Sequence, residues 1–153
     1  MSIQVIANPH TQTYRRFKSD VMSSAFPWNY HHGDGASPAH YYHTILARPG
    51  FEESLMPTQQ SDWLNIANKV LLEIFMANEI KVKSVLRIVV NCTHETDGHT
   101  TPLHMDHNFE TNNIVVYLNH FECGATNVEG DSHNPKEDDI IIFDGFHSIE
   151  QPC

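Results

Sequence analysis

Basic residues are scarce in this 153-residue chain, which has 9 lysines and arginines against 19 aspartates and glutamates. The formal net charge of -10 disfavours nonspecific binding to nucleic-acid phosphates, because such binding needs a positively charged face. No apolar run comes near the roughly 20 residues that a membrane-spanning helix needs. The N-terminus lacks the basic region and apolar core of a signal peptide. We therefore expect no nucleic-acid partner, no membrane and a cytoplasmic location.

Cysteines are also few, and the three residues Cys92, Cys123 and Cys153 cannot all pair within one chain. No two of them have the spacing of a C-x-x-C motif, so we expect free thiols in a reducing compartment. Such a compartment also suits a ferrous ion. The length and the 40% hydrophobic content favour a folded chain with one domain over residues 1–153.

Histidine, by contrast, is abundant, with 12 residues, and the pattern His-x-Asp occurs twice, at residues 32–34 and 104–106. Chance alone gives roughly 0.7 copies for this composition, so the surroundings must decide what each copy means. The first copy lies in His31–Ala39, whose glycines, serine and proline are typical of a loop. Metal ligands need to lie on secondary-structure elements that the surrounding fold holds in place. We therefore interpret this segment as a polar loop or an active-site lid, and not as the primary metal site.

The hydrophobic pattern predicts two helices followed by several short strands. The helices are expected at Thr11–Met22 and at Ser61–Ile80, the second capped by Ser61 or Asp62. Strands are expected at Ile3–Ile6, His40–Ala47, Ser84–Cys92, Leu103–His107, Asn112–Asn119 and Asp139–Phe143. Helices early and strands late favour a mainly β fold with flanking helices (α+β), in which a barrel or sandwich is buttressed by N-terminal helices.

The second His-x-Asp copy falls on one of these expected strands. Alternate side chains of a strand share a face, so His104 and Asp106 would converge there. One further histidine would complete two histidines and a carboxylate, the ligand set of non-haem Fe(II) oxygenases. His147 is the best candidate, because it follows an apolar strand and the Asp144-Gly145 turn can re-aim it. Taken alone, such a histidine is more often structural than a metal ligand.

Four segments occur in a suggestive order: His104-Met105-Asp106, Tyr117-Leu118-Asn119, Gly124-Ala125-Thr126 and Phe143-Asp144-Gly145-Phe146-His147. With these segments the chain resembles the Fe(II)- and 2-oxoglutarate-dependent dioxygenases, specifically the small prolyl-4-hydroxylase-like group, from about Val85 to Pro152. The resemblance implies a double-stranded β-helix, a jelly-roll of the cupin type, with Fe(II) held by His104, Asp106 and His147. It also implies 2-oxoglutarate and O2 as co-substrates, with ascorbate as a candidate reductant. The reaction would hydroxylate an unactivated C–H bond of a peptide side chain or a small metabolite and release succinate and CO2.

The same resemblance assigns a role to Tyr117, which matches a family tyrosine that reaches the distal carboxylate of 2-oxoglutarate. A core tyrosine with its hydroxyl paired elsewhere is an equally good interpretation. The chain departs from the family after His147, where the family carries an arginine or lysine for that carboxylate and residues 148–153 contain none. Three alternatives remain: strands after Cys153 supply the cation, Arg87 replaces it, or the protein binds metal without 2-oxoglutarate.

Three functions are therefore weighed. The first is the iron- and 2-oxoglutarate-dependent hydroxylase, and the second is a cupin-like metal-binding module or remnant without turnover. The third, a zinc hydrolase, would need a dedicated general base, for which we find no candidate. His94 and His99 precede the motif and are either orienting groups or exposed side chains, and His107 is expected to face away from the metal. Nothing in the sequence selects a substrate or an oligomeric state.

Overall fold

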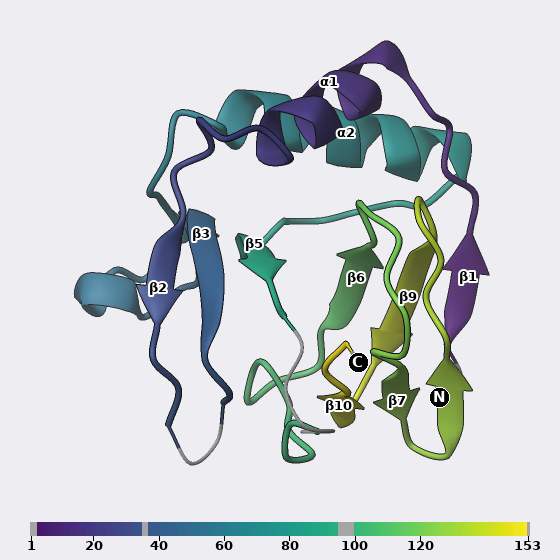
Figure 1. The fold of residues 1–153 in the computed structure, drawn as a ribbon. Helices are drawn as coiled ribbons and strands as arrows, with labels where there is room; N and C mark the ends of the chain where they lie inside the picture. Colours follow the sequence, from purple (N-terminus) through teal and green to yellow (C-terminus); the bar gives the residue numbers. More distant parts are fainter. Residues whose placement is uncertain (1–2, 35–36, 95–99, 153) are drawn as a thin grey trace. The chain divides into compact units, whose positions relative to one another are not determined.

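The computed structural model describes residues 3–34, 37–94 and 100–152, in which the chain forms ten short β-strands and two α-helices (Figure 1). The elements fall into two compact units. One, here called the strand unit, comprises Met1–Asn8, His32–His40 and Thr93–Cys153; the other, the helix unit, comprises Pro9–His31 and Tyr41–Cys92. The expected mainly β fold with helices is confirmed, whereas the jelly-roll topology and the single domain stay predictions.

The strand unit contains two three-stranded antiparallel sheets, in the orders β1-β9-β6 and β10-β7-β8. Their bounds are β1 (Gln4–Ile6), β6 (Asn112–Val116), β7 (Thr126–Val128), β8 (Asp131–His133), β9 (Ile140–Asp144) and β10 (His147–Ile149). Strand β9 lies between β1 and β6 and has adjacent residues Ile140 and Ile141 fully buried. Adjacent strand residues point to opposite faces, so both faces of β9 are covered. This burial explains its nearly continuous apolar sequence.

The core of the strand unit is a cluster of four buried side chains: Tyr117, Val128, Ile141 and Phe143. Three partly buried residues pack against it: Ile3, Val115 and Phe121. Its members come from β9, from β7 and from the end of β6 or just beyond, so burial of apolar surface holds the two sheets of this unit together. The cluster therefore fixes the strand that leads into His147.

Strands β7 and β8 were not among the strands expected from the sequence. They form a hairpin in which Val128 pairs with Asp131 across the two-residue loop Glu129-Gly130. Both loop residues have positive φ, 41° and 91°, as the favoured two-residue hairpin turns require. Three-residue strands are too short to give an alternating pattern, but the glycine of the two-residue loop was a usable signal.

The expected strand Leu103–His107 is wrong, because only His104 pairs there, in an isolated bridge with His147. Pro102 has no N–H to donate to a ladder. Its carbonyl instead accepts a hydrogen bond from Nδ1 of His104 at 2.8 Å, which closes a local turn. Three further elements are shorter than expected, namely β5 at Ile88–Cys92, α2 at Leu64–Ala77 and β6 at Asn112–Val116.

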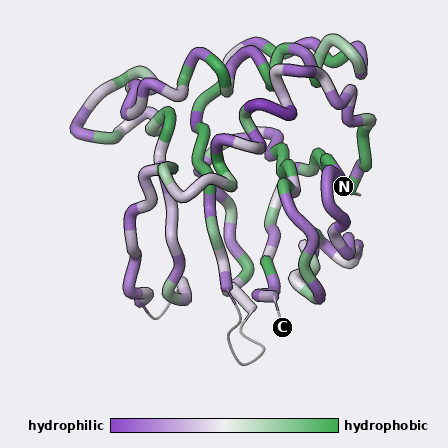
Figure 2. The backbone as a smooth tube through the Cα atoms, turned by 45° about the horizontal axis from the view of Figure 1, so that its top comes forward, coloured by the Kyte–Doolittle hydropathy of each residue, from purple (hydrophilic) through white to green (hydrophobic). Residues whose placement is uncertain are grey.

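The helix unit holds α1 (Gln12–Val21), α2 and a four-stranded sheet of β2 (Asn29–His31), β3 (His40–Ala47), β4 (Thr58–Gln59) and β5, besides a short 3-10 turn at Phe51–Glu53. Helix α1 is capped by Thr11, whose side chain accepts from the backbone N–H of Tyr14 at 3.1 Å. Each helix buries one side: Tyr14, Phe17 and Val21 on α1, and Ala67, Val70 and Ile74 on α2. This spacing of three and four residues is why hydrophobic and hydrophilic stretches alternate along both helices in Figure 2.

Glu73 connects the two helices, because its carboxylate accepts hydrogen bonds from Thr11 Oγ1 (2.5 Å) and Thr13 Oγ1 (3.0 Å). Replacing Glu73 with alanine removes the charged acceptor of both bonds. We expect a loss of about 1–2 kcal/mol in the free energy of unfolding, because two bonds to a charged group are lost but the half-buried threonine hydroxyls can bond to water instead. Urea unfolding followed by circular dichroism measures it. Lys69→Ala, an exposed change on the same helix, should cost clearly less.

Two predictions about the environment have different outcomes. Within the residues that the structure describes, no helix is both long and apolar enough to cross a bilayer, and the cytoplasmic location stays a prediction. The expectation of free thiols holds for Cys92, which is free and exposed. It was wrong for Cys123, which is disulfide-bonded. The backbone of Cys123 pairs with Pro152 in an antiparallel bridge, a neighbour that sequence spacing does not reveal. Cys153 lies outside the described residues.

Candidate metal centre

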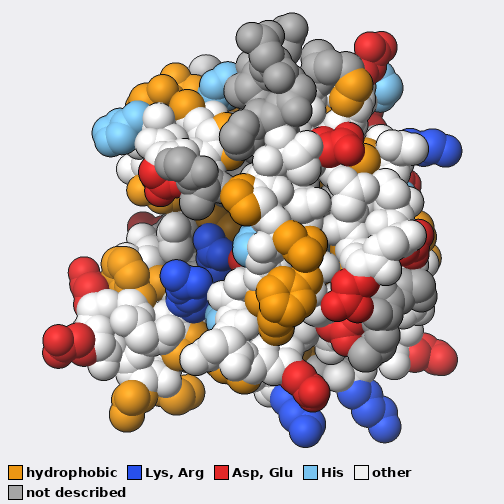
Figure 3. All heavy atoms as spheres, turned by 90° about the horizontal axis from the view of Figure 1, so that it is seen from below, with side chains coloured by type: hydrophobic (Ala, Val, Ile, Leu, Met, Phe, Trp, Pro, Cys, Tyr) orange, Lys and Arg blue, Asp and Glu red, His pale blue; other side chains and the backbone are white. Residues whose placement is uncertain are grey.

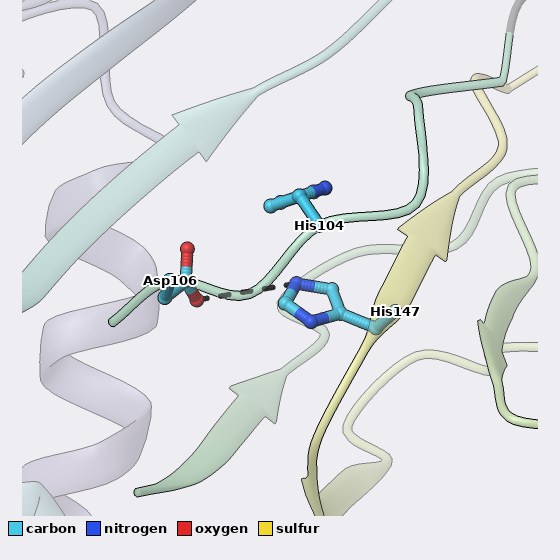
Figure 4. Close-up of side chains that lie close together, drawn as sticks. All are labelled: His104, Asp106 and His147. Atoms are coloured by element: carbon cyan, nitrogen blue, oxygen red, sulfur yellow. Dashed lines mark ion pairs between the residues drawn. The ribbon is translucent and has the colours of Figure 1, made fainter. Parts of the chain in front are cut away.

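Three side chains that we predicted as ligands converge in the strand unit (Figure 4). His104, Asp106 and His147 each offer one donor atom, and these three atoms lie within 4.8 Å of one another. Nε2 of His147 is 3.9 Å from Oδ2 of Asp106. Within the described ranges no other group of three or more such side chains has this geometry. The convergence therefore singles out His104 and His147 among the histidines in the described part of the chain.

The backbone creates this convergence by pairing two distant segments. His104 and His147 exchange two N–H···O hydrogen bonds of 2.9 Å each. Residues opposite each other in an antiparallel pair place their side chains on one face, and the two imidazole centroids lie 4.4 Å apart. Gly145 precedes this pair with φ of 80°, a left-handed conformation that glycine adopts without steric cost. The turn thus redirects the chain from β9 into β10, and His147 begins β10.

His147 is the buried member of the set, with only 3% of its surface exposed. Burial lowers its pKa below the ordinary value, and His104 lowers it further, whereas Asp106 and the carbonyl of Gly145 act in the opposite direction. Among the described residues, Nδ1 of His147 has no hydrogen-bond partner of normal geometry. A neutral imidazole with an available lone pair is the form that binds a metal.

His104 is oriented by a hydrogen bond to the backbone. A carbonyl can only accept, so Nδ1 of His104 must donate to the carbonyl of Pro102, 2.8 Å away. In the neutral imidazole that bond fixes the tautomer, with the proton on Nδ1 and the lone pair on Nε2. A backbone or carboxylate partner on the far nitrogen is the usual support of a metal-binding histidine. Pro102 is a contributor that sequence reasoning missed, because a carbonyl carries no side-chain signal.

The donor set suits a divalent transition metal. Two imidazole nitrogens and one carboxylate oxygen match the two-histidine, one-carboxylate arrangement that leaves coordination positions open on Fe(II). Ligands at about 2.1 Å in neighbouring positions lie roughly 3 Å apart, so the side chains must draw together slightly when a metal binds. Zn(II) accepts the same donors. The residues therefore fit an implied Fe(II) but do not by themselves exclude another metal of this class.

Phe143 packs its ring against His147 from inside the strand unit, with centroids 5.0 Å apart and the ring planes at 62° in an edge-to-face arrangement. Phe143 also belongs to the buried core cluster. One side of the His147 imidazole therefore faces apolar surface, which excludes water from that side and restricts the rotation of the ring. The resemblance placed Phe143 in a motif without giving it this role.

Tyr117 lies in the core, and its hydroxyl is 2.7 Å from Oγ1 of Thr126, where either oxygen can donate. Burial raises the pKa of Tyr117, so the hydroxyl stays protonated, although the bond to Thr126 acts in the opposite direction. This is the arrangement expected of a core tyrosine with its hydroxyl paired elsewhere. Contact of Tyr117 with a co-substrate carboxylate stays a prediction.

Cations are almost missing from the unit that carries the three ligands. The strand unit contains one basic residue, Lys136, which is exposed. Arg87, the predicted partner of the co-substrate carboxylate, is an exposed residue of the helix unit, just before β5. Acidic side chains are scattered over the face shown in Figure 3 and do not gather in one patch. The role of Arg87 stays a prediction.

The other histidines that we singled out are not part of the ligand set. In the first His-x-Asp copy, Asp34 closes a local turn, because its Oδ1 accepts from the backbone N–H of Ser37 at 2.8 Å. The ring of His107 lies 5.1 Å from that of Phe109. His94 is exposed, and His99 lies outside the described residues, as does part of the His31–Ala39 loop. The interpretation of residues 32–34 as a loop is consistent with this geometry.

Comparison with protein-family models, with curated proteins and with solved structures gives no match for this chain. The assignment of the site therefore rests on the convergence of His104, Asp106 and His147 and on the support that the backbone gives them.

Proposed function

We propose that the chain is a non-haem Fe(II)- and 2-oxoglutarate-dependent oxygenase that hydroxylates an unactivated C–H bond of a peptide side chain or a small metabolite. The observation that carries the proposal is the convergence of two histidines and one aspartate within 4.8 Å. That donor set, with open coordination positions, is typical of this class of enzyme. The resemblance from Val85 to Pro152 supplies the choice of 2-oxoglutarate as co-substrate.

In this proposal His104, Asp106 and His147 hold the metal. Bound Fe(II) would supply the electrons that allow O2 to oxidise 2-oxoglutarate to succinate and CO2 and to place one oxygen atom in the substrate C–H bond. The chain keeps both imidazoles able to bind: burial lowers the pKa of His147, and the carbonyl of Pro102 accepts a hydrogen bond from Nδ1 of His104, which leaves Nε2 facing the metal. The carboxylate of Asp106 offsets one of the two positive charges of the ion.

A second candidate function is a metal-binding module without 2-oxoglutarate turnover. The distribution of cations favours it, because Lys136 is the one basic residue of the strand unit. A dianionic co-substrate in a mostly apolar cavity needs a positively charged partner. The module needs only the three metal ligands and no such partner. The two functions therefore differ in one measurable property, the formation of succinate.

The test is to purify the chain under argon, add Fe(II), 2-oxoglutarate and ascorbate, admit O2, and measure succinate. We expect formation above that of the Asp106→Asn variant, whose rate should fall to background because the charged ligand is lost while the size of the side chain is kept. Oxygenases of the proposed class turn over slowly even without their prime substrate, so this assay needs no knowledge of the substrate.

Metal binding is measured on the same samples by titration with Fe(II). Stoichiometric binding without succinate would favour the module over the oxygenase. Absence of binding would contradict both functions. His32→Ala serves as the matched control, because it alters the other His-x-Asp copy and should change neither readout.

A further inference from the structure

A second pair of reactive side chains lies in the helix unit. His43 on β3 is buried, with 9% of its surface exposed, and uses both ring nitrogens. Nδ1 lies 2.8 Å from the carbonyl oxygen of Pro27, and Nε2 lies 2.7 Å from Oγ of Ser61. The carbonyl can only accept, so Nδ1 carries the proton and Nε2 is the acceptor for the Ser61 hydroxyl. A serine hydroxyl therefore donates to a histidine that is oriented by a third group.

The imidazole is held in place by more than these bonds. The ring of Phe26 lies 5.0 Å from that of His43 in an edge-to-face arrangement, and Phe26 itself is buried. Phe26 also contacts Trp63, with ring centroids 5.4 Å apart. Such packing keeps His43 in a single orientation toward Ser61. An oriented base beside a hydroxyl is the arrangement that activates a serine nucleophile.

Ser61 lies just before α2, where backbone N–H groups point toward the start of the helix. Oγ of Ser61 accepts from the N–H of Trp63 at 3.2 Å. The helix begins at Leu64, whose N–H donates to the carbonyl of Ser61 at 3.3 Å. The first turn of a helix carries partial positive charge and unsatisfied N–H donors. Partial positive charge at this end of the helix favours the negative charge that develops on the ester carbonyl oxygen during acyl transfer.

Ser61 also lines an open pocket of about 610 Å³, together with Pro27, Gln59, Gln60, Asp62 and Trp63. Such a volume accommodates a small organic molecule. The lining combines the apolar surfaces of Pro27 and Trp63 with two neutral amides and one carboxylate. The carboxylate of Asp62 disfavours anionic ligands, so uncharged esters with a short apolar acyl group fit best.

The geometry points to a serine-dependent esterase site at Ser61, with His43 as general base and the Pro27 carbonyl as the group that orients it. Oγ of Ser61 attacks the ester carbonyl and its proton passes to Nε2 of His43. The C–O bond to the alcohol breaks, and the alcohol leaves with that proton. Water then attacks the acyl-serine, Oγ recovers a proton through His43, and the carboxylic acid is released. The sum is ester plus water to acid plus alcohol, and no metal takes part.

The experiment uses the full chain with EDTA present and two probes, p-nitrophenyl butyrate and a fluorophosphonate. We expect release of nitrophenol above the uncatalysed rate, and one phosphonyl adduct on Ser61 in the mass of the intact protein and its peptides. Ser61→Ala should abolish the adduct. His43→Gln should slow labelling at least about a hundredfold, since a general base contributes on that order.

Two exposed positions in the same unit supply matched controls. Ser24→Ala and His10→Gln should label and hydrolyse as the unaltered chain does, and circular dichroism checks that all four variants are folded. An unaltered chain that gives no adduct on Ser61, or a Ser61→Ala variant that hydrolyses the ester equally fast, overturns the assignment. Equal labelling of His43→Gln would show that Ser61 and His43 only connect β3 to the start of α2.

Discussion

Replacing His147 with alanine is expected to reduce the affinity of the chain for a divalent metal by more than about a hundredfold, because loss of a ligand should exceed the 10–100-fold cost of losing an outer hydrogen-bond partner. His147 is the buried member of the set, and its backbone pairs with His104, so it supplies the only ligand from the second segment. Without it, His104 and Asp106 remain as a two-ligand set on one irregular segment. Isothermal titration with Fe(II) under argon, or with Co(II) in air, measures the change.

Two comparisons make this result specific. Asp106→Asn keeps the size of the side chain and removes only its charge, so it should weaken binding without loss of fold. His32→Ala alters the other His-x-Asp copy and should bind metal as the unaltered chain does. A His147→Ala variant that keeps stoichiometric binding, or a His32→Ala variant that loses it, would show that we assigned the wrong residues.

The three side chains that converge could be named from the sequence, but not for the reason first given. We expected His104 and Asp106 to share the face of a regular strand, whereas only His104 pairs and the residues after it bend. The set converges because the backbone of His104 pairs with that of His147, a contact between residues 43 positions apart that no local pattern contains. The residue types in the sequence indicated the candidate ligands. The backbone pairing that brings them together is a tertiary contact, which the sequence pattern does not show.

The same distinction holds for the fold. The long periodic segments α1 and β3 were predicted close to their observed bounds, and α2 was found but expected to be longer at both ends, because an amphipathic pattern over eight or more residues is a strong signal for an element and a weaker one for its ends. The three-residue strands β7, β8 and β10 were missed, because pairing with a neighbour defines them and their own residues do not. The Ser61–His43 pair was missed for a related reason. Ser61 was interpreted only as a helix cap and His43 only as a strand residue.

Ile141→Ala is the second change for which we expect a large effect. Ile141 is completely buried on β9, where it belongs to the core cluster with Tyr117, Val128 and Phe143. Truncating a fully buried isoleucine removes apolar contacts and leaves a cavity, so we expect a loss of about 2–5 kcal/mol in the free energy of unfolding. Urea unfolding followed by circular dichroism measures it. Ile142→Ala, a partly exposed change on the same strand, should cost clearly less.

Metal binding should partly reverse that loss. A ligand that binds only the folded chain stabilises it by an amount that grows with its concentration, about 2.7 kcal/mol at one hundred times the dissociation constant. Ile141 does not belong to the ligand set, so Co(II) should stabilise the Ile141→Ala variant by nearly as much as the unaltered chain. In the double variant with His147→Ala the stabilisation should disappear. If Co(II) stabilises the double variant as much as the Ile141→Ala variant, the metal binds elsewhere. His147, which follows β9 and Gly145, is then not a ligand of the metal centre.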